Sequence, residues 1–343
     1  MALDQAPGVR VNAIAPGDVA TESIEEAMED EDVRQSLPDQ TPLERFAGRR
    51  NYNVRLNLEP LTSGRGWGNF LNGWADVVRS MSDESVLLDV EDGIATVTLN
   101  EPDMRNALTG DVAGGIVDAM DEIGDSDARC VVITGAGGSF SAGGDINAML
   151  EGLHGEVAPF EKVQNINDTS EALKRVHECE LPVIAKIDGT CFGAGANLAI
   201  ACDVQVASEG SRISFGFRQV GLAVDTGTSY FLPRIVGQNK AQELVLTGAM
   251  LDADEAEDLG LFTQVYDEEE FEDEAAEYVD RIATGPTVAL KTSKRLIRQG
   301  LTSDLDQAMT NEAAGQAQVF ETHDHEEGAT AFMEGRDPDF EGH

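Results

Sequence analysis

Two glycine-containing turns carry the strongest chemical signal in this sequence, and each runs from a predicted strand toward a predicted helix. The first is FSAGGDI, Phe140 to Ile146, and the second is FGAGANLA, Phe192 to Ala199. Small residues let a ligand approach the backbone, and free N–H groups at a helix start can donate to an anion or a polarised carbonyl. One such turn is more often explained by tight packing of a strand against a helix. Two of them predict paired N–H donors that converge on one oxygen, as in an oxyanion hole.

The side chains near these turns offer few groups that could move a proton. Asn197 lies inside the second turn, and an amide cannot act as a general acid or base near neutral pH. Asp225, in the segment GLAVDTGTS, stands just before a small-residue helix start. An aspartate there can serve as an N-cap, so a capping role and a chemical role both stay open on the residues alone.

The elements that must position these turns follow an α/β pattern. Ile94 to Leu99 alternates as a half-buried strand, and Cys130 to Thr134 is a short apolar run typical of a covered strand. Between them, Thr109 is the expected cap of a helix whose apolar face holds Val112, Ile116, Met120 and Ile123. We expect further strands at residues 182–187, 203–207 and 262–266, and helices throughout the chain after about Glu268.

The first 80 residues differ from the rest in composition. Residues 6–23 and 41–48 resemble late segments of the short-chain dehydrogenases, but the glycine-rich first turn and the Tyr-x-x-x-Lys pair of that family are missing. We therefore interpret residues 1–50 as a non-functional remnant of such an enzyme. We interpret residues 51–80, which hold both tryptophans and few acids, as a linker. The functional protein is expected to begin at Met81.

The charge of the chain limits its partners. Its 343 residues include 64 acidic and 24 basic side chains, which gives a formal net charge of −40. Such a surface repels nucleic acids and anionic lipids, so neither nucleic acid nor membrane is an expected partner. The sequence predicts a cytoplasmic protein, and its many dispersed carboxylates with few lysines are typical of organisms that live at high salt.

Cysteine and histidine offer no sign of a metal centre. The four cysteines show no CxxC spacing and are expected to be buried structural thiols. The five histidines are expected to form no ligand cluster, so no metal is predicted.

Three segments resemble landmarks of the crotonase, or enoyl-CoA hydratase/isomerase, superfamily: NALT (residues 106–109), FSAGGDI, and GTCFGAGANLAIACD (residues 189–203). The resemblance continues to the end of the chain. It implies an α/β fold in which residues 81–267 form a spiral of ββα repeats and residues 268–343 form a helical region that helps build trimers. It also implies an acyl-CoA substrate, no separate cofactor because coenzyme A is part of that substrate, and a homotrimer or dimer of trimers.

The same resemblance assigns binding roles. It places the oxyanion hole on the backbone N–H groups of Gly144 and Ala194. It places coenzyme A near Arg105 and Ala107 and along the stretch Ala142, Gly143, Gly144, Asp145 and Ile146. On its own chemistry, Asp145 is well placed to cap a helix that starts at Ile146.

The proton-transfer positions depart from the common family pattern. Hydratases of this family use two glutamates, and the matching positions here are Asn197 and Gln219, both amides. Asp225 matches the working aspartate of the phenylacetate-pathway enoyl-CoA isomerase. The resemblance thus predicts double-bond isomerisation with Asp225 as the carboxylate. The alternatives are an enoyl-CoA hydratase that adds water with Asp225, and a non-catalytic acyl-CoA-binding protein.

Overall fold

The structure of the protein, a computed structural model, describes residues 2–3, 11–12, 85–146, 149–150 and 159–343. The chain divides into two units, Met1–Asp83 and Glu84–His343. In the first unit, β1 (Ala2–Leu3) pairs antiparallel with β2 (Val11–Asn12). The rest of the dehydrogenase-like segment and the whole of the predicted linker lie outside the described residues.

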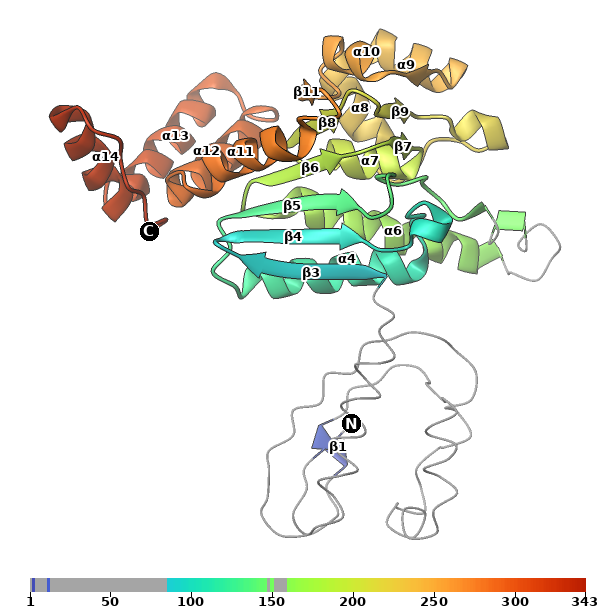
Figure 1. The fold of residues 1–343 in the computed structure, drawn as a ribbon, viewed down its shortest axis with the longest axis horizontal. Coiled ribbons are helices and arrows are strands. Elements are labelled where there is room, and N and C mark those ends of the chain that lie inside the picture. The colour runs from blue at the N-terminus through green and yellow to red at the C-terminus, as the bar shows by residue number, and fades with distance from the viewer. Residues whose placement is uncertain (1, 4–10, 13–84, 147–148, 151–158) are drawn as a thin grey trace. The chain divides into compact units, whose positions relative to one another are not determined.

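A six-stranded sheet forms the centre of the second unit (Figure 1). Its strand order is β11-β8-β6-β5-β4-β3, and all neighbours are parallel except β3 and β4, which form an antiparallel hairpin. The strands are β3 (Val86–Glu91), β4 (Ile94–Leu99), β5 (Cys130–Gly135), β6 (Val183–Ile187), β8 (Val204–Ser208) and β11 (Gln264–Tyr266). All five strands predicted from the sequence are confirmed, whereas β3 was not predicted.

A smaller sheet runs beside the first and gives the chain its spiral course. It has the order β10-β9-β7, with β7 (Thr190–Phe192), β9 (Arg212–Ser214) and β10 (Met250–Leu251). The chain adds a strand to the large sheet, then a strand to the small sheet, and then a helix. One such turn consists of β6, β7 and α7 (Ala194–Ala201), and the next consists of β8, β9, the short helix η3 (Phe217–Val220), α8 (Thr228–Val236) and α9 (Gln238–Thr247). This is the predicted spiral of ββα repeats.

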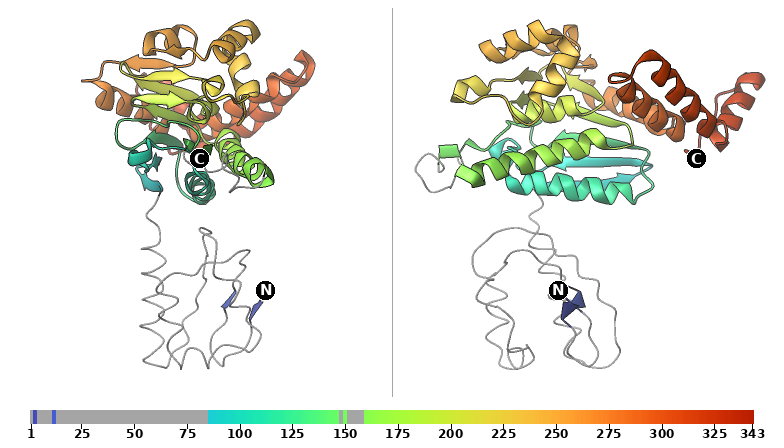
Figure 2. Two further views of the ribbon diagram at one scale, coloured as in Figure 1. Left: turned by 90° about the vertical axis from the view of Figure 1, so that its right-hand side faces the viewer. Right: turned by 180° about the vertical axis from the view of Figure 1, so that it is seen from behind.

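Two long helices cover one face of the large sheet (Figure 2). The helix α4 (Gly110–Gly124) follows β4 and the short helix η2 (Pro102–Met104), and α6 (Pro159–Glu178) packs beside α4. The predicted cap is confirmed, because Thr109 Oγ1 accepts a hydrogen bond from the Val112 N–H at 3.2 Å. The predicted apolar face is also confirmed, since Val112, Ile116, Met120 and Ile123 are all buried.

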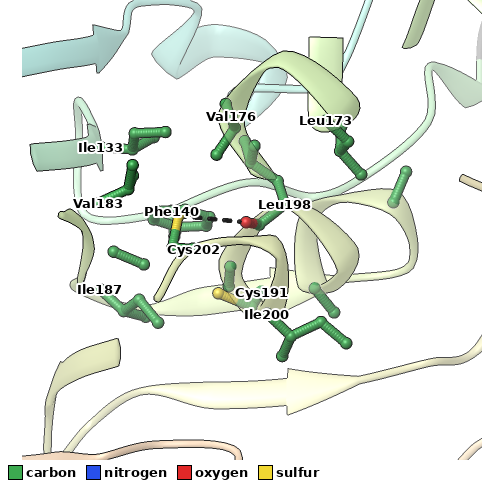
Figure 3. Close-up of a cluster of buried hydrophobic side chains, with 14 of the residues drawn as sticks. Ile133, Phe140, Leu173, Val176, Val183, Ile187, Cys191, Leu198, Ile200 and Cys202 are labelled. Atoms are coloured by element: carbon green, nitrogen blue, oxygen red, sulfur yellow. Dashed lines mark hydrogen bonds between the residues drawn. The ribbon is translucent and has the colours of Figure 1, made fainter. Parts of the chain in front are cut away.

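The core between these layers is built from aliphatic side chains, Phe140 and two thiols (Figure 3). Ile133 and Val183 of the large sheet face Val176 of α6, while Cys191 and Cys202 are buried nearby. Burial raises the pKa of both thiols, and Cys202 Sγ donates to the Leu198 carbonyl at 3.4 Å. Cys130 is also buried, whereas Cys179 is only half-buried, so the predicted burial is confirmed for three of the four cysteines.

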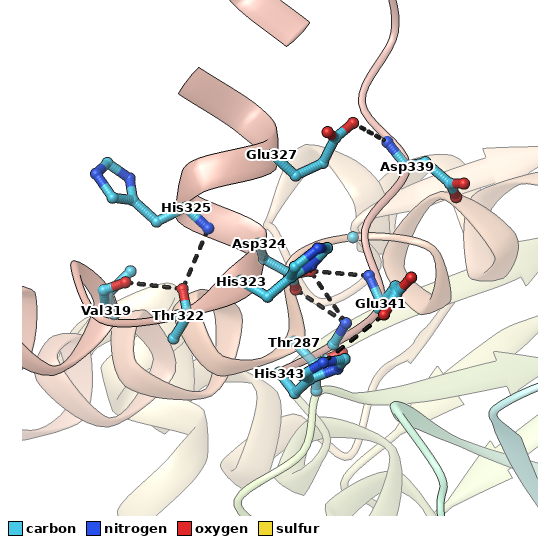
Figure 4. A network of polar contacts seen from close by, with 12 residues as sticks. Thr287, Val319, Thr322, His323, Asp324, His325, Glu327, Asp339, Glu341 and His343 are labelled. Carbon is cyan, nitrogen blue, oxygen red and sulfur yellow. Dashed lines mark hydrogen bonds and ion pairs between the residues drawn. The ribbon is translucent and has the colours of Figure 1, made fainter. Parts of the chain in front are cut away.

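Four helices complete the chain, after the short helix α10 (Ala253–Asp258): α11 (Phe271–Ala283), α12 (Thr287–Gly300), α13 (Leu305–Val319) and α14 (His323–Glu334). The predicted helical C-terminal region is therefore confirmed. The segment after α14 folds back onto the start of that helix (Figure 4). There the buried Asp324 carboxylate accepts from the N–H groups of Glu341 and Gly342, and Glu327 accepts from the Asp339 N–H. Among the described residues, no helix is both long and apolar enough to cross a bilayer.

This fold-back corrects one sequence expectation. The histidines were expected to form no ligand cluster, yet the donor atoms of His323, Glu341 and His343 all lie within 4.8 Å of one another. The two imidazole rings stack with their centroids 5.4 Å apart. The sequence could not show this, because it is the fold-back that brings position 343 to the first residue of α14.

A salt-bridge cluster joins α12 to the starts of the strands β6 and β8. Asp203 Oδ2 accepts from the Val183 N–H at 2.7 Å and from Lys294 Nζ at 2.5 Å, and its Oδ1 accepts from Arg298 at 2.7 Å. The Asp203 side chain is 22% exposed and that of Lys294 only 10%, so solvent screens the Asp203–Lys294 pair weakly.

We expect Asp203→Asn to lower the free energy of unfolding by about 3 kcal/mol, because it leaves two cations beside a neutral amide. Urea denaturation of the full chain measures this loss. The matched control is Asp121→Asn, which removes the carboxylate from the exposed pair with Arg175 and should cost less than about 1 kcal/mol. Equal losses in the two variants would contradict the assigned role of Asp203.

Candidate functional site

The two glycine turns lie side by side because successive turns of the spiral pair in register. Ser141, at the start of the first turn, forms a parallel bridge with Cys191 of β7. Its N–H donates to the Thr190 carbonyl at 3.0 Å, and the Phe192 N–H donates to its carbonyl at 2.9 Å. The predicted meeting of the two turns is therefore a direct result of strand pairing.

The glycines of these turns allow a closer approach than any other residue would. Gly143 has a φ of +84°, and a Cβ placed on it would lie 2.3 Å from the Phe192 carbonyl oxygen and 3.2 Å from the Ala194 nitrogen. A Cβ on Gly195 would lie 2.5 Å from the Ser141 carbonyl oxygen. A methyl group at either position would push the two turns apart.

Two backbone N–H groups at this junction have no partner among the residues that the structure describes. Ala194 is the first residue of α7, whose N-cap Gly193 supplies no side chain, and first-turn N–H groups have no acceptor within their own helix. Within the described part of the chain, neither the Ala194 N–H nor the Gly144 N–H donates a hydrogen bond. Both can therefore donate to a bound ligand at a helix end that favours negative charge.

Asn106 fastens a third loop to this junction. Its side chain is fully buried, donates to the carbonyls of Ala136 (2.9 Å) and Ser139 (2.7 Å), and accepts from the Glu101 N–H at 2.9 Å. Ser141 Oγ returns a hydrogen bond to the Asn106 carbonyl at 2.7 Å. This anchoring role of Asn106 was not predicted from the sequence. The one indication was an asparagine in a tight loop, because Asn tolerates the left-handed φ of +54° found here.

This loop brings the expected coenzyme A residues together. The Ala142 N–H donates to the Arg105 carbonyl at 2.8 Å, and the Leu108 N–H donates to the Gly143 carbonyl at 2.7 Å. The Arg105 side chain is exposed beside this contact, and Ala107 is buried beneath it. These two hydrogen bonds thus hold the loop at residues 105–108 against the first glycine turn.

The first glycine turn continues into a helical segment. A helical segment begins at Ile146, and the Met149 N–H donates to the Asp145 carbonyl at 3.1 Å, which places Asp145 at the N-cap position. The Ile146 side chain is 49% exposed. A Cβ on Gly144 would lie 2.6 Å from the Met149 methyl, so apolar groups border the Gly144 N–H.

Asn197 holds the segment that carries Asp225. Its side chain is fully buried, and Nδ2 donates to the Asp225 backbone carbonyl at 3.0 Å and to Thr226 Oγ1 at 2.8 Å. Its Oδ1 accepts from Thr228 Oγ1 at 2.9 Å. Asn197 therefore bonds the backbone of Asp225, not its carboxylate, and anchors that residue to the same turn of α7 that bears the Ala194 N–H.

The Asp225 carboxyl group is half-buried and carries no ion pair among the described residues. Burial raises its pKa, and a hydrogen bond from Thr226 Oγ1 to Oδ1 at 3.1 Å opposes part of that rise. The capping role left open by the sequence is not observed, because the N-cap of α8 is Gly227 and no side chain caps that helix. The carboxylate is therefore available for chemistry.

Gln219 lies apart from this hydrogen-bonded group. It belongs to η3, its side chain is exposed, and Nε2 donates to the Gly248 carbonyl at 3.1 Å. This contact connects η3 to the end of α9. The catalytic role of Gln219 stays a prediction.

Comparisons with known proteins agree with this geometry. Residues 89–343 match the family described as enoyl-CoA hydratase/isomerase. The chain belongs to this family. It is 32% identical over 260 residues to the 1,2-epoxyphenylacetyl-CoA isomerase of Escherichia coli, an alignment that covers 76% of this chain and 99% of the relative. It is 35% identical over 256 residues to the short-chain-enoyl-CoA hydratase of Clostridium acetobutylicum, covering 74% of this chain and 95% of the relative.

Solved structures that resemble this fold are also enoyl-CoA hydratases or hydratase/isomerases. A putative enoyl-CoA hydratase from Streptomyces coelicolor superimposes with a TM-score of 0.71 at 34% identity, covering 76% of this chain and 95% of that one. The crotonase fold and membership in this family of enzymes are thereby established. Because the similar proteins include both hydratases and isomerases, the family leaves the reaction to be argued from the site.

Proposed function

We propose that this enzyme isomerises the double bond of an enoyl-CoA thioester, with Asp225 as its single proton carrier. The observation that carries the proposal is the anchoring of Asp225, through Asn197, to the helical turn whose first N–H is free. Both positions that hold glutamates in the two-glutamate hydratases carry amides here, Asn197 and Gln219. One carboxylate suffices for moving a proton between two carbons, whereas hydration by the two-glutamate route needs two acid–base groups.

The reaction begins with the thioester carbonyl between the N–H groups of Gly144 and Ala194. In a 3-enoyl-CoA, Asp225 removes a proton from the carbon next to the carbonyl, and the electron pair spreads over the carbonyl and the double bond. The two N–H groups stabilise the negative charge that develops on the oxygen. Asp225 then returns the proton to the far carbon of the former double bond, which gives a 2-enoyl-CoA without gain or loss of atoms.

The surroundings of Asp225 suit this task. Burial raises the pKa of its carboxyl group toward the range in which one group can both take and return a proton. Large apolar side chains close in sequence to the site are exposed, at Ile146 and Met149 after the first turn and at Val220 and Leu222 before Asp225. These can receive an apolar acyl chain, and Arg105 can face a phosphate of coenzyme A.

Steady-state kinetics on a panel of 2-enoyl-, 3-enoyl- and ring-bearing CoA esters tests the proposal. We expect the highest kcat/KM on a 3-enoyl-CoA, with slow or no hydration of crotonyl-CoA. Faster hydration of crotonyl-CoA would favour the second candidate, a hydratase that uses Asp225 and water, a reaction that the names of several relatives suggest. Tight binding without turnover on the whole panel would favour a non-catalytic acyl-CoA-binding protein.

We also propose a cofactor requirement, an oligomeric state and a cellular environment for the enzyme. The enzyme needs no cofactor beyond the coenzyme A of its substrate, and it forms a homotrimer or a dimer of trimers. Large apolar side chains exposed on α12 and α14, such as Ile297 and Phe332 (85% exposed), support assembly through the helical region. The charge of −40 supports a cytoplasmic protein adapted to high salt and argues against nucleic-acid and membrane partners.

We further propose that residues 1–80 are dispensable and that residues 81–267 and 268–343 form the working enzyme. The family match begins at residue 89, and the second structural unit begins at Glu84. Removing residues 1–80 is therefore expected to leave kcat/KM and the melting temperature unchanged. Loss of activity in a truncated protein that still melts cooperatively would contradict this division.

A further inference from the structure

A chain of hydrogen bonds leads from the buried Asn197 to the Asp225 carboxylate. The backbone carbonyl of Asp225 can only accept, so the Asn197 atom that faces it must be Nδ2. The second hydrogen of Nδ2 points to Thr226 Oγ1 at 2.8 Å. Since Thr226 Oγ1 accepts this bond, its own single hydrogen is left for Asp225 Oδ1, 3.1 Å away.

The backbone at Thr226 is held in an unusual conformation to make this contact. Its φ is +42°, in the left-handed region that β-branched residues rarely adopt, and its side chain is buried. Such strain persists only where surrounding contacts impose it, and it occurs often at functional sites. Here the Thr226 hydroxyl is held by the bond from Asn197, and the next residue, Gly227, also has a positive φ of +93°.

The second carboxylate oxygen has no such partner. Among the described residues, nothing donates a hydrogen bond to Asp225 Oδ2, whereas Oδ1 is held by Thr226. The two oxygens of the carboxylate are therefore unequal before any substrate binds.

We propose that Thr226 is a positioning residue that binds Oδ1, fixes the orientation of the carboxylate and leaves Oδ2 as the oxygen that takes and returns the proton. This inference rests on the proposed function of Asp225 and extends it to a residue that neither the sequence nor the family match singled out. Because the bond favours the ionised carboxylate, it keeps Asp225 ready as a base in spite of burial.

Other titratable groups on the packed elements are engaged elsewhere. Arg218 of η3 donates to the Thr247 carbonyl, and Arg234 of α8 stacks on the Tyr230 ring. His177 of α6 packs edge-on against Phe231 with the ring centroids 5.0 Å apart, and burial lowers its pKa. The helix α7 contains no ionisable side chain. A change in the pH dependence of a Thr226 variant can thus be assigned to Asp225.

The test compares Thr226→Val, which keeps the shape and removes the hydroxyl, with Thr226→Ser, which keeps the hydroxyl. In the valine variant, we expect kcat to fall roughly tenfold, the effect of one hydrogen bond to a charged group. Loss of the bond raises the pKa of Asp225, so the acid limb of the kcat/KM–pH profile moves to higher pH. The serine variant should keep the wild-type limb. Thr226→Ala repeats the test without the bulk of valine if the valine variant does not fold.

Two results would overturn the inference. One is an acid limb that does not move in a folded variant without the hydroxyl, and the other is a serine variant that shifts like the valine variant. Neither result bears on Asp225 itself. The proposed function fails by a different observation, namely retained isomerisation in Asp225→Asn, so the two failures are distinguishable.

Discussion

Replacing Asp225 by asparagine is expected to lower kcat for double-bond migration by roughly 10²–10⁴-fold, the contribution typical of a positioned general acid–base group. The amide keeps the shape of the side chain and can still accept from Thr226 through its oxygen, so the local structure should persist. What is lost is the ability to bind and release a proton. Affinity for a CoA ester should stay close to that of the wild type, because the two N–H groups proposed as donors and the loop proposed to bind coenzyme A are unchanged.

The matched control is Asp254→Asn, an exposed aspartate on α10 that is remote in sequence from both glycine turns. It makes the same chemical change and should leave turnover intact. Steady-state kinetics combined with calorimetric titration of a non-reactive CoA ester separates a chemical defect from a binding defect. If Asp225→Asn turned over at the wild-type rate, another group would have to carry the proton.

Replacing Ala194 by proline is expected to cost roughly 10²–10³-fold in kcat, because it removes one of the two proposed oxyanion donors. Proline is tolerated at the first position of a helix, where the missing N–H has no helical acceptor, so α7 should still form. The side chain of Ala194 is itself buried, so we also expect a moderate loss of melting temperature.

Ala253→Pro provides the comparison for this effect. Ala253 is likewise a buried alanine at the first position of a helix, α10. It follows Asp252, whose backbone is extended, the conformation that a residue before proline prefers. This variant should show a similar change in melting temperature and near wild-type kcat. A comparable loss of activity in both proline variants would mean that Ala194→Pro acts through stability. That result would contradict the proposed role of the Ala194 N–H in an oxyanion hole.

The sequence predicted the elements with a clear apolar pattern and missed most of the short strands. β4 follows from alternation, β5 and β6 follow from short apolar runs, and the capped helix α4 follows from Thr109 and its apolar face. β3 was not predicted because all of its side chains are half-buried or exposed, so its apolar residues show no clear buried face. β7 and β9 have three residues each, too few for a period to be read, yet they set the register of the two glycine turns.

The sequence predicted the contact between the two glycine turns but not the hydrogen bonds between distant segments around Asp225. The meeting of residues 140–146 with residues 192–199 was expected and is observed through the Ser141–Cys191 bridge. The role of Thr226 could not be predicted, because it follows from a left-handed φ and a partner 29 residues away. The sequence singled out both Asn197 and Asp225, but the bond from the Asn197 side chain to the Asp225 backbone carbonyl became visible only in the folded chain.

The most direct test of the central claim is the identity of the first product from a 3-enoyl-CoA, followed by proton NMR. The account predicts that the wild-type enzyme forms the 2-enoyl-CoA without an accompanying 3-hydroxyacyl-CoA, and that Asp225→Asn leaves the substrate unchanged over the same time. A 3-hydroxyacyl-CoA as the first product, or undiminished conversion by Asp225→Asn, would contradict it.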